Sequence, residues 1–106
     1  MATPSRRDQL TEAQWLKQVR QLAELLGWTF YHPWLSRFSP RGFPDIVLCR
    51  PPRLLFAELK TDTGRLTPDQ ERWIELLRAC RQEVYVWRPL LLSRWYRRRS
   101  RGRPCT

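Results

Sequence analysis

The chain has 106 residues, with 20 lysines and arginines against 10 aspartates and glutamates, which gives a formal net charge of +10. That length accommodates one small domain, and a hydrophobic share of 42% with 6 tryptophans excludes the low hydrophobicity of a disordered chain. A folded domain with this basic excess is expected to bind a polyanion, either nucleic acid or an acidic membrane surface, rather than a small neutral substrate.

The first predicted element is a helix over residues 11–26. Thr11 is its expected N-cap, with Gln14 three residues on as in a capping box, and Gly27 offers a left-handed stop. Apolar residues recur at helical spacing: Trp15, Leu16, Val19, Leu22, Ala23 and Leu26. Glu12 falls inside this stripe, where it either serves a functional site or complements the helix dipole in the first turn.

Three strands are expected next. Residues 28–32 form a short β-prone run closed by Pro33, and a loop over 33–44 follows. The apolar runs 46–49 and 54–60 are separated by the tetrapeptide Arg50-Pro51-Pro52-Arg53, so they are predicted to pair as an antiparallel hairpin.

A second helix is predicted from Thr67, where Pro68 and Gln70 complete a dense helix-start signal, to about Arg81. Its expected apolar positions are Trp73, Leu76, Leu77 and Cys80. Residues 84–87 form the last strand, and the crossover through the helix would make it parallel to its neighbour. The predicted fold is a single small α/β domain of order helix-strand-strand-strand-helix-strand, with helices flanking a mixed sheet.

Register arithmetic on the hairpin brings charged residues together. A turn centred between Pro51 and Pro52 places Asp45 opposite Glu58, and Lys60 projects to the same face two residues later. Paired carboxylates suit Mg²⁺ or Mn²⁺, which would polarise a phosphate and activate water, while Lys60 would orient that water or hold transition-state charge. The alternative interpretation is a solvated strand edge with a cross-strand salt bridge from Lys60.

These residues resemble the PD-(D/E)XK nuclease signature: Gly42-Phe43-Pro44-Asp45, then Glu58-Leu59-Lys60 after twelve residues. The fuller pattern resembles the VRR-NUC branch of that superfamily over about residues 11–89. Its segments are Gly27-Trp28, Tyr31-His32-Pro33, Ser36-Arg37, Gly42 to Asp45, Glu58 to Lys60, and Thr67 to Gln70. The resemblance implies a restriction-endonuclease-like core.

The resemblance also implies roles for single residues. Asp45 and Glu58 would bind Mg²⁺ or Mn²⁺ with the main-chain carbonyl of Leu59, and Lys60 would serve the attacking water. Glu12 would match the acid that the first helix contributes to the catalytic site, with the metal among its contacts. Gln70 would match a glutamine near the active site, although its place in the capping box also explains it. The resemblance further implies a homodimer that acts on branched DNA such as four-way junctions, as small members of this branch do.

Most of the positive charge lies away from these residues. All but two of the basic residues are arginines, and the stretch 94–106 holds six of them without an acid. We therefore divide the chain into a nuclease-like domain over 1–92, with its core at 11–89, and a basic tail over 93–106. The expected phosphate contacts are Arg37, Arg41 and Arg65, with Arg50 and Arg53 also assigned to loops flanking the site, and Arg97, Arg98, Arg99, Arg101 and Arg103 of the tail.

Other features of the sequence argue against further classes of protein. No apolar run approaches the roughly 18 residues that cross a bilayer, and the first residues lack the apolar stretch of a secretory signal. We expect a protein of the bacterial or phage-infected host cytoplasm, without a membrane partner or a small-molecule cofactor. Cys49, Cys80 and Cys105 are odd in number and lack ligand-like spacing, which argues against disulfides and zinc. His32 is interpreted as structural or as a substrate-loop contact.

The leading hypothesis is a Mg²⁺-dependent deoxyribonuclease, an endonuclease for structured or branched DNA. The alternative is a non-catalytic nucleic-acid-binding protein on a nuclease-like scaffold. Two adjacent carboxylates argue against a pure binder, because without a metal they would repel phosphate. A basic protein that contacts acidic protein or membrane would explain the tail but would leave Asp45, Glu58 and Lys60 unexplained.

Overall fold

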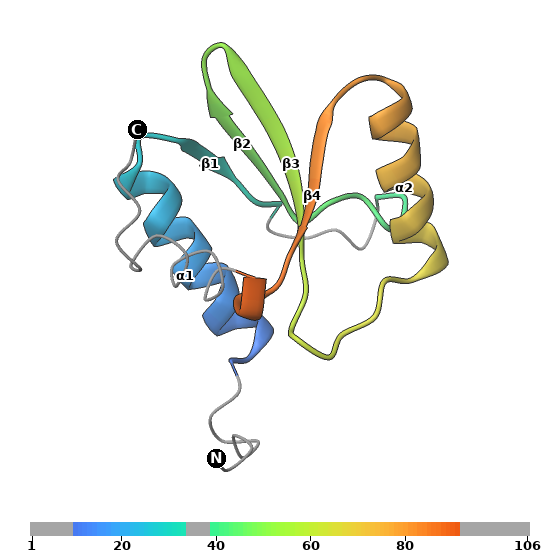
Figure 1. Cartoon of the computed structure of the whole chain (residues 1–106), viewed down its shortest axis with the longest axis horizontal. Coiled ribbons are helices and arrows are strands. Elements are labelled where there is room, and N and C mark those ends of the chain that lie inside the picture. The colour runs from blue at the N-terminus through green and yellow to red at the C-terminus, as the bar shows by residue number, and fades with distance from the viewer. Residues whose placement is uncertain (1–9, 34–38, 92–106) are drawn as a thin grey trace, which may run out of the picture.

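The computed structural model describes residues 10–33 and 39–91. The elements in chain order are α1 (Glu12–Leu25), β1 (Thr29–Tyr31), β2 (Ile46–Arg50), β3 (Arg53–Leu59), α2 (Pro68–Ala79) and β4 (Glu83–Trp87). The strands form one sheet in the order β1-β2-β3-β4, antiparallel except for the parallel pair β3 and β4. Figure 1 shows α1 and α2 on opposite sides of this sheet. The predicted α/β fold and its mixed sheet are confirmed.

Both helices begin where the sequence predicts. At each start a threonine side chain accepts from a glutamine N–H while the glutamine side chain accepts from the threonine N–H, in the pairs Thr11–Gln14 and Thr67–Gln70. Gly27, just beyond α1, has φ +83°, the left-handed conformation expected of a helix stop. The second helix ends at Ala79, slightly before its predicted end, because Arg81 already adopts φ 61°.

The core lies between α1 and one face of the sheet. Trp15, Val19 and Ala23 of α1 are buried against alternate residues of β2 and β3: Ile46, Leu48, Leu55, Ala57 and Leu59. Leu16 is partly buried, as the stripe predicted. The predictions for Leu22 and Leu26 are wrong: both leucines lie exposed, to the side of the buried line of Trp15, Val19 and Ala23 that packs on the sheet.

The other face of the sheet carries α2, which is anchored by fewer side chains. Ile74 is buried and Trp73 and Leu77 are half-buried, whereas the predicted core positions Leu76 and Cys80 are exposed. The helix lies over the β4 side of the sheet, so it covers only part of this face. Within residues 10–33 and 39–91, no helix has the length and apolar character required to cross a membrane.

The hairpin register agrees with the prediction. Cys49 pairs with Leu54, Val47 with Phe56, and Ile46 with Ala57. Asp45 directly precedes Ile46 and Glu58 directly follows Ala57, so the register carries the two acids to the open end of the hairpin. This end of the sheet positions the candidate site.

Candidate active site

Glu58 is the one buried charged side chain in the described part of the chain, with 2% of its surface exposed. Its Oε1 accepts a hydrogen bond from Nε2 of Gln70 at 2.9 Å, and Nζ of Lys60 lies 3.9 Å from the same oxygen. Burial, first, and the negative charge of Asp45, second, raise the pKa of Glu58 to about 8, while the charge of Lys60 opposes the shift. A cation held between the two carboxyl groups would offset the charge repulsion that contributes to this shift.

Asp45 is held from both sides. Its Oδ2 accepts a hydrogen bond of 2.8 Å from the backbone N–H of Leu59, the residue after Glu58. Its backbone carbonyl lies 2.8 Å from Nδ1 of His32. Because a carbonyl can only accept, the ring donates from Nδ1 in this contact. The carboxylate of Asp45 is thus fixed beside Glu58, as the register predicted.

The segment before Asp45 is built for close packing on α2. Gly42 has φ +95°, and a Cβ there would collide with the backbone of Asp69 in the first turn of the helix. Phe43 packs edge-on against Phe56 and Trp73, with ring centroids 5.8 and 5.1 Å away. Only glycine satisfies both the backbone conformation and the contact, so the Gly-Phe-Pro-Asp string has a structural cause.

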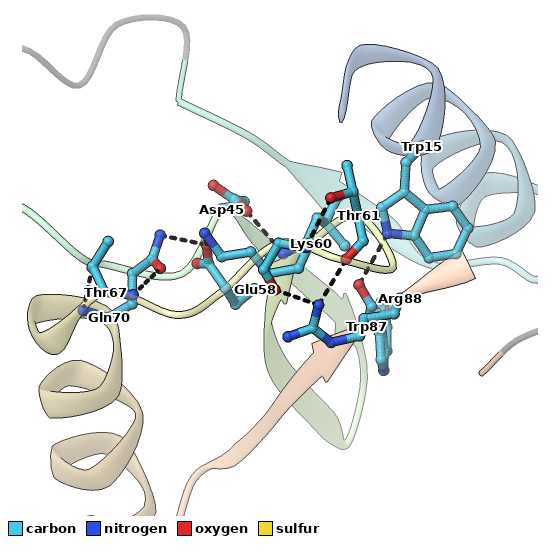
Figure 2. Close-up of polar contacts among 11 residues, drawn as sticks. Trp15, Asp45, Glu58, Lys60, Thr61, Thr67, Gln70, Trp87 and Arg88 are labelled. Carbon is cyan, nitrogen blue, oxygen red and sulfur yellow. Dashed lines mark hydrogen bonds and ion pairs between the residues drawn. The ribbon is translucent and has the colours of Figure 1, made fainter. Parts of the chain in front are cut away.

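Lys60 lies at the end of β3 with 11% of its side chain exposed. Its backbone N–H donates to the carbonyl of Trp87 at 3.1 Å, and the indole N–H of Trp15 donates to the same oxygen at 3.0 Å. The loop that follows is anchored by Arg88, whose guanidinium donates to the carbonyls of Thr61 and Gly64 (Figure 2). These contacts hold the backbone of Lys60 and of the loop that follows it.

Gln70 has two partners at once. Its Oε1 accepts from the backbone N–H of Thr67 at 2.9 Å, which completes the capping box, while its Nε2 donates to Glu58. Figure 2 shows Thr67 and Gln70 at the start of α2, with the amide directed toward Glu58. The capping role and the proposed site role of Gln70 are therefore both compatible with one conformation.

Glu12 approaches the site from α1. It lines a cavity of about 230 Å³ together with Asp45, Leu59, His32, Ala13 and Leu16. Among residues 10–33 and 39–91, however, no three His, Cys, Asp or Glu side chains gather closely enough to hold a metal ion. The structure therefore brings Glu12 to the same cavity as Asp45 without joining it to the carboxylate pair.

The donor set nevertheless fits a hard divalent cation. Glu58 is driven toward its protonated form by its burial first and by the charge of Asp45 second, and a cation bound by both carboxylates would offset both effects. Oxygen donors in small number suit Mg²⁺ or Mn²⁺, which retain several waters, better than they suit zinc. Asp45, Glu58 and the Leu59 carbonyl are the groups that would hold it.

The arginines divide by position. Arg41 lines a second cavity, of about 630 Å³, beside Asp45 and Gln70, and Arg65 is exposed on the loop after Lys60. The prediction that Arg50 and Arg53 flank the site is wrong, because they pair at the opposite end of the hairpin. The remaining predicted contacts lie outside the described residues: Arg37, Arg97, Arg98, Arg99, Arg101 and Arg103.

Sequence reasoning missed several positioning contacts. It assigned no role to Arg88 or Trp87, and it left the partner of His32 open, because these contacts join segments far apart in the chain. The one available signal was that His32 closes a strand immediately before a proline. Leu90 and Leu91, just after the last strand, are about half exposed, at 51% and 50%.

Comparisons with known proteins bear on the family and the fold. Residues 9–89 match the VRR-NUC domain family. A solved structure titled "VRR_NUC domain protein" is similar in fold, with a TM-score of 0.64, 22% sequence identity, and coverage of 76% of this chain and 79% of that chain. No curated protein sequence matches the chain.

Proposed function

The chain belongs to the VRR-NUC domain family, a family of nucleases, and from that premise we propose that it is a metal-dependent endonuclease that hydrolyses phosphodiester bonds in structured or branched DNA. The observation that carries this proposal is the buried carboxyl of Glu58 beside Asp45 and Lys60. A protein that only binds DNA gains nothing from two adjacent acids, one of them buried, because both oppose the approach of a phosphate.

Each residue has a defined task in this proposal. Asp45, Glu58 and the Leu59 carbonyl would hold Mg²⁺ or Mn²⁺, which when bound supplies Lewis acidity toward the phosphate. Lys60 holds its ammonium beside the carboxylate pair, where it orients the attacking water and offsets negative charge that develops in the transition state. Gln70 fixes the orientation of the Glu58 carboxylate through its 2.9 Å hydrogen bond.

The charge distribution supports DNA as the substrate. Arg41 lines the cavity beside Asp45 and Gln70, and Arg65 is exposed on the loop after Lys60, so both would contact phosphates near the cut. The arginine-rich segment 93–106 would add contacts that depend on charge rather than on base sequence. The described part of the chain holds one such site, and we further propose that a homodimer makes paired cuts on the two strands of a branched substrate.

The direct experiment incubates the purified protein with supercoiled plasmid, single-stranded DNA, a four-way junction and a linear duplex of matched sequence. Each substrate is tested with Mg²⁺, with Mn²⁺ and with a chelator. We expect cleavage only with a divalent metal, and faster cleavage of the junction than of the matched linear duplex. Sedimentation of the protein alone and on the junction measures whether two copies assemble.

The outcomes separate the proposals. Tight junction binding without cleavage under any metal condition would favour the alternative of a non-catalytic binding protein. Equal rates on junction and duplex would contradict the preference for branched DNA while leaving the nuclease activity standing. Cleavage by a chain that remains monomeric on the junction would contradict paired cutting by a dimer.

A further inference from the structure

The larger cavity beside the site is a separate feature that the cleavage chemistry does not explain. Its volume is about 630 Å³, within the range that small-molecule pockets occupy. It shares Asp45 and Gln70 with the candidate active site, and it extends from there across the part of the sheet that α2 leaves open. Whatever enters it therefore lies directly beside the position of the cut.

One wall of this cavity is aromatic and rigid. Trp73 of α2 donates its indole N–H to the carbonyl of Arg41 at 3.0 Å, which fixes the ring. Phe43 packs edge-on against Trp73, with centroids 5.1 Å apart at 75°, and also against Phe56. Gly42 locks this segment onto α2 through its close approach to Asp69. The wall is thus formed before any ligand arrives.

Tyr31 lines the same cavity from β1, on the edge of the sheet farthest from α2. It pairs with Val47, which also lines the cavity, so a tyrosine ring stands beside an apolar patch of β2. The side chain is 61% exposed, a large share for an aromatic residue on a strand. An exposed ring beside an apolar pocket offers a face on which a flat ligand can stack.

From this arrangement we propose that the cavity receives one unpaired nucleobase of the DNA, stacked on Tyr31, with the adjoining phosphodiester directed to Asp45. This inference rests on the proposed function and gives it a substrate class. The nuclease would act on DNA that has an unpaired nucleotide beside the cut, as at a fork, a flap or an imperfect junction.

The chemistry of the lining favours a base over a phosphate. Among the described residues that line it, the aromatic rings are those of Tyr31, His32, Phe43 and Trp73, and Pro33, Pro40 and Pro44 add apolar surface. Within the same described lining, Arg41 is the one residue with a full positive charge, and the negative charge of Asp45 opposes the entry of an anion. Aromatic faces bind bases of any sequence, whereas bases inside a duplex are already stacked and cannot reach a pocket in the protein surface.

The test measures binding, so that it does not depend on cleavage. Asp45→Asn is used as the DNA-binding background, since an asparagine carbonyl can still accept the hydrogen bond from Leu59. Its affinity for a forked duplex is measured by fluorescence anisotropy while an abasic residue is placed at each unpaired position in turn. Tyr31→Ala, Tyr31→Phe and the control Tyr85→Ala are combined with that background. Tyr85 lies on β4, outside both cavities.

One unpaired position is expected at which loss of the base weakens binding about tenfold, the scale of one stacked base. Tyr31→Ala should weaken binding to the intact fork by a similar factor and should abolish the effect of the abasic residue, because both changes remove the same contact. Tyr31→Phe should bind as the parent does, because its ring still stacks, and Tyr85→Ala should leave the abasic effect intact.

Three results would overturn the inference: no position at which the base matters, unchanged binding by Tyr31→Ala, or multiplicative effects of Tyr31→Ala and the abasic residue. In each case metal-dependent cleavage by the wild-type protein, measured separately, still decides the proposed function. Failure of the wild-type protein to cleave, together with a coupled loss of binding at Tyr31, would overturn the nuclease proposal and leave the base pocket.

Discussion

The side-chain amide of Gln70 joins the start of α2 to the carboxyl of Glu58: its Nε2 donates to Glu58 Oε1 at 2.9 Å while its Oε1 accepts from the N–H of Thr67 at 2.9 Å. The capping box fixes the plane of the amide, so the free N–H points at the buried acid. A helix-start signal that is readable in the sequence thereby positions a residue of the site.

Replacing Gln70 by alanine removes both contacts, and we expect cleavage to fall about 10- to 100-fold, the usual scale for a residue that supports a metal ligand. Thr67→Ala is the matched control, because it removes the hydroxyl that caps Gln70 but leaves the donor to Glu58. A helix cap is worth about 1 kcal/mol, so both variants should lose similar thermal stability. Initial cleavage rates and melting temperatures of the two variants provide the comparison.

If the two variants lose activity in proportion to their stability, Gln70 acts only as a cap and the proposed positioning role is wrong. The activity of Gln70→Ala must fall well below that of Thr67→Ala at temperatures where both proteins are folded.

The sequence predicts those parts of the site that depend on short separations. Each capping box joins residues three positions apart, and the hairpin register follows from a tight turn. The position of Gln70 and the proximity of Asp45 to Glu58 could therefore be predicted from the sequence. The solvent exposure of individual side chains was harder to predict. Leu22 fits the apolar stripe of α1, yet it lies exposed at 38% because the narrow sheet does not reach it.

Contacts between segments far apart in the chain could not be predicted from the sequence. The ring of His32 meets the carbonyl of Asp45 across 13 residues, and Arg88 meets the carbonyl of Thr61 across 27. No local pattern encodes either contact. Arg53 was misplaced for a related reason. It is close to Glu58 in the sequence, but five residues of extended strand carry it roughly 17 Å away, to the opposite end of the hairpin.

The raised pKa of Glu58 predicts a pH-dependent stability of the metal-free protein. The carboxyl has a usual pKa of 4.5 and a folded-state pKa of about 8, because of burial first and the charge of Asp45 second. Between these values the folded protein retains a proton that the unfolded chain has released. The stabilising contribution is therefore complete below about pH 4.5 and is lost as the pH rises through about 8.

Melting temperatures in chelator between pH 5 and pH 9 measure this effect, with Glu58→Gln as the reference that cannot titrate. The wild type should lose stability relative to Glu58→Gln as the pH rises. Adding Mg²⁺ should stabilise the wild type more at high pH, because a metal binds the ionised carboxylate. A difference that stays constant with pH would contradict the assigned pKa.

Gly42→Ala tests the packing of the segment that carries Asp45. The left-handed φ of +95° and the collision of a Cβ with Asp69 both oppose the substitution, which should cost more than about 1 kcal/mol of stability. Cleavage should fall as well, because the displaced backbone carries Asp45 with it. Gly64→Ala is the control: its φ is not positive, and the tightest contact of its Cβ would be the Thr61 hydroxyl at 3.0 Å, with Lys60 Cδ and Thr61 N at 3.5 and 3.6 Å in ordinary contact. Denaturant unfolding that finds equal losses for both variants would refute the explanation for Gly42.

The salt dependence of DNA binding tests the division of the arginines. Each phosphate contact contributes about 0.9 to the slope of log affinity against log salt on duplex DNA, so Arg41→Ala and Arg65→Ala should each lower the slope by about that amount. Arg53→Ala removes the same charge from the far end of the hairpin, where its guanidinium pairs with Glu83 at 2.7 and 3.1 Å, and should leave the slope unchanged. Equal slopes for all three variants would mean that only net charge matters.

The central claim is that Asp45, Glu58 and Lys60 form one metal-dependent cleavage site, and single-turnover cleavage of a junction by Asp45→Asn and Lys60→Ala tests it most directly. We predict that both variants lose at least about 100-fold in rate with Mg²⁺. Asp45→Asn should still bind the junction, and the wild type should stop cutting in chelator. Undiminished cleavage by Asp45→Asn, or cleavage by the wild type that survives the chelator, would contradict the claim.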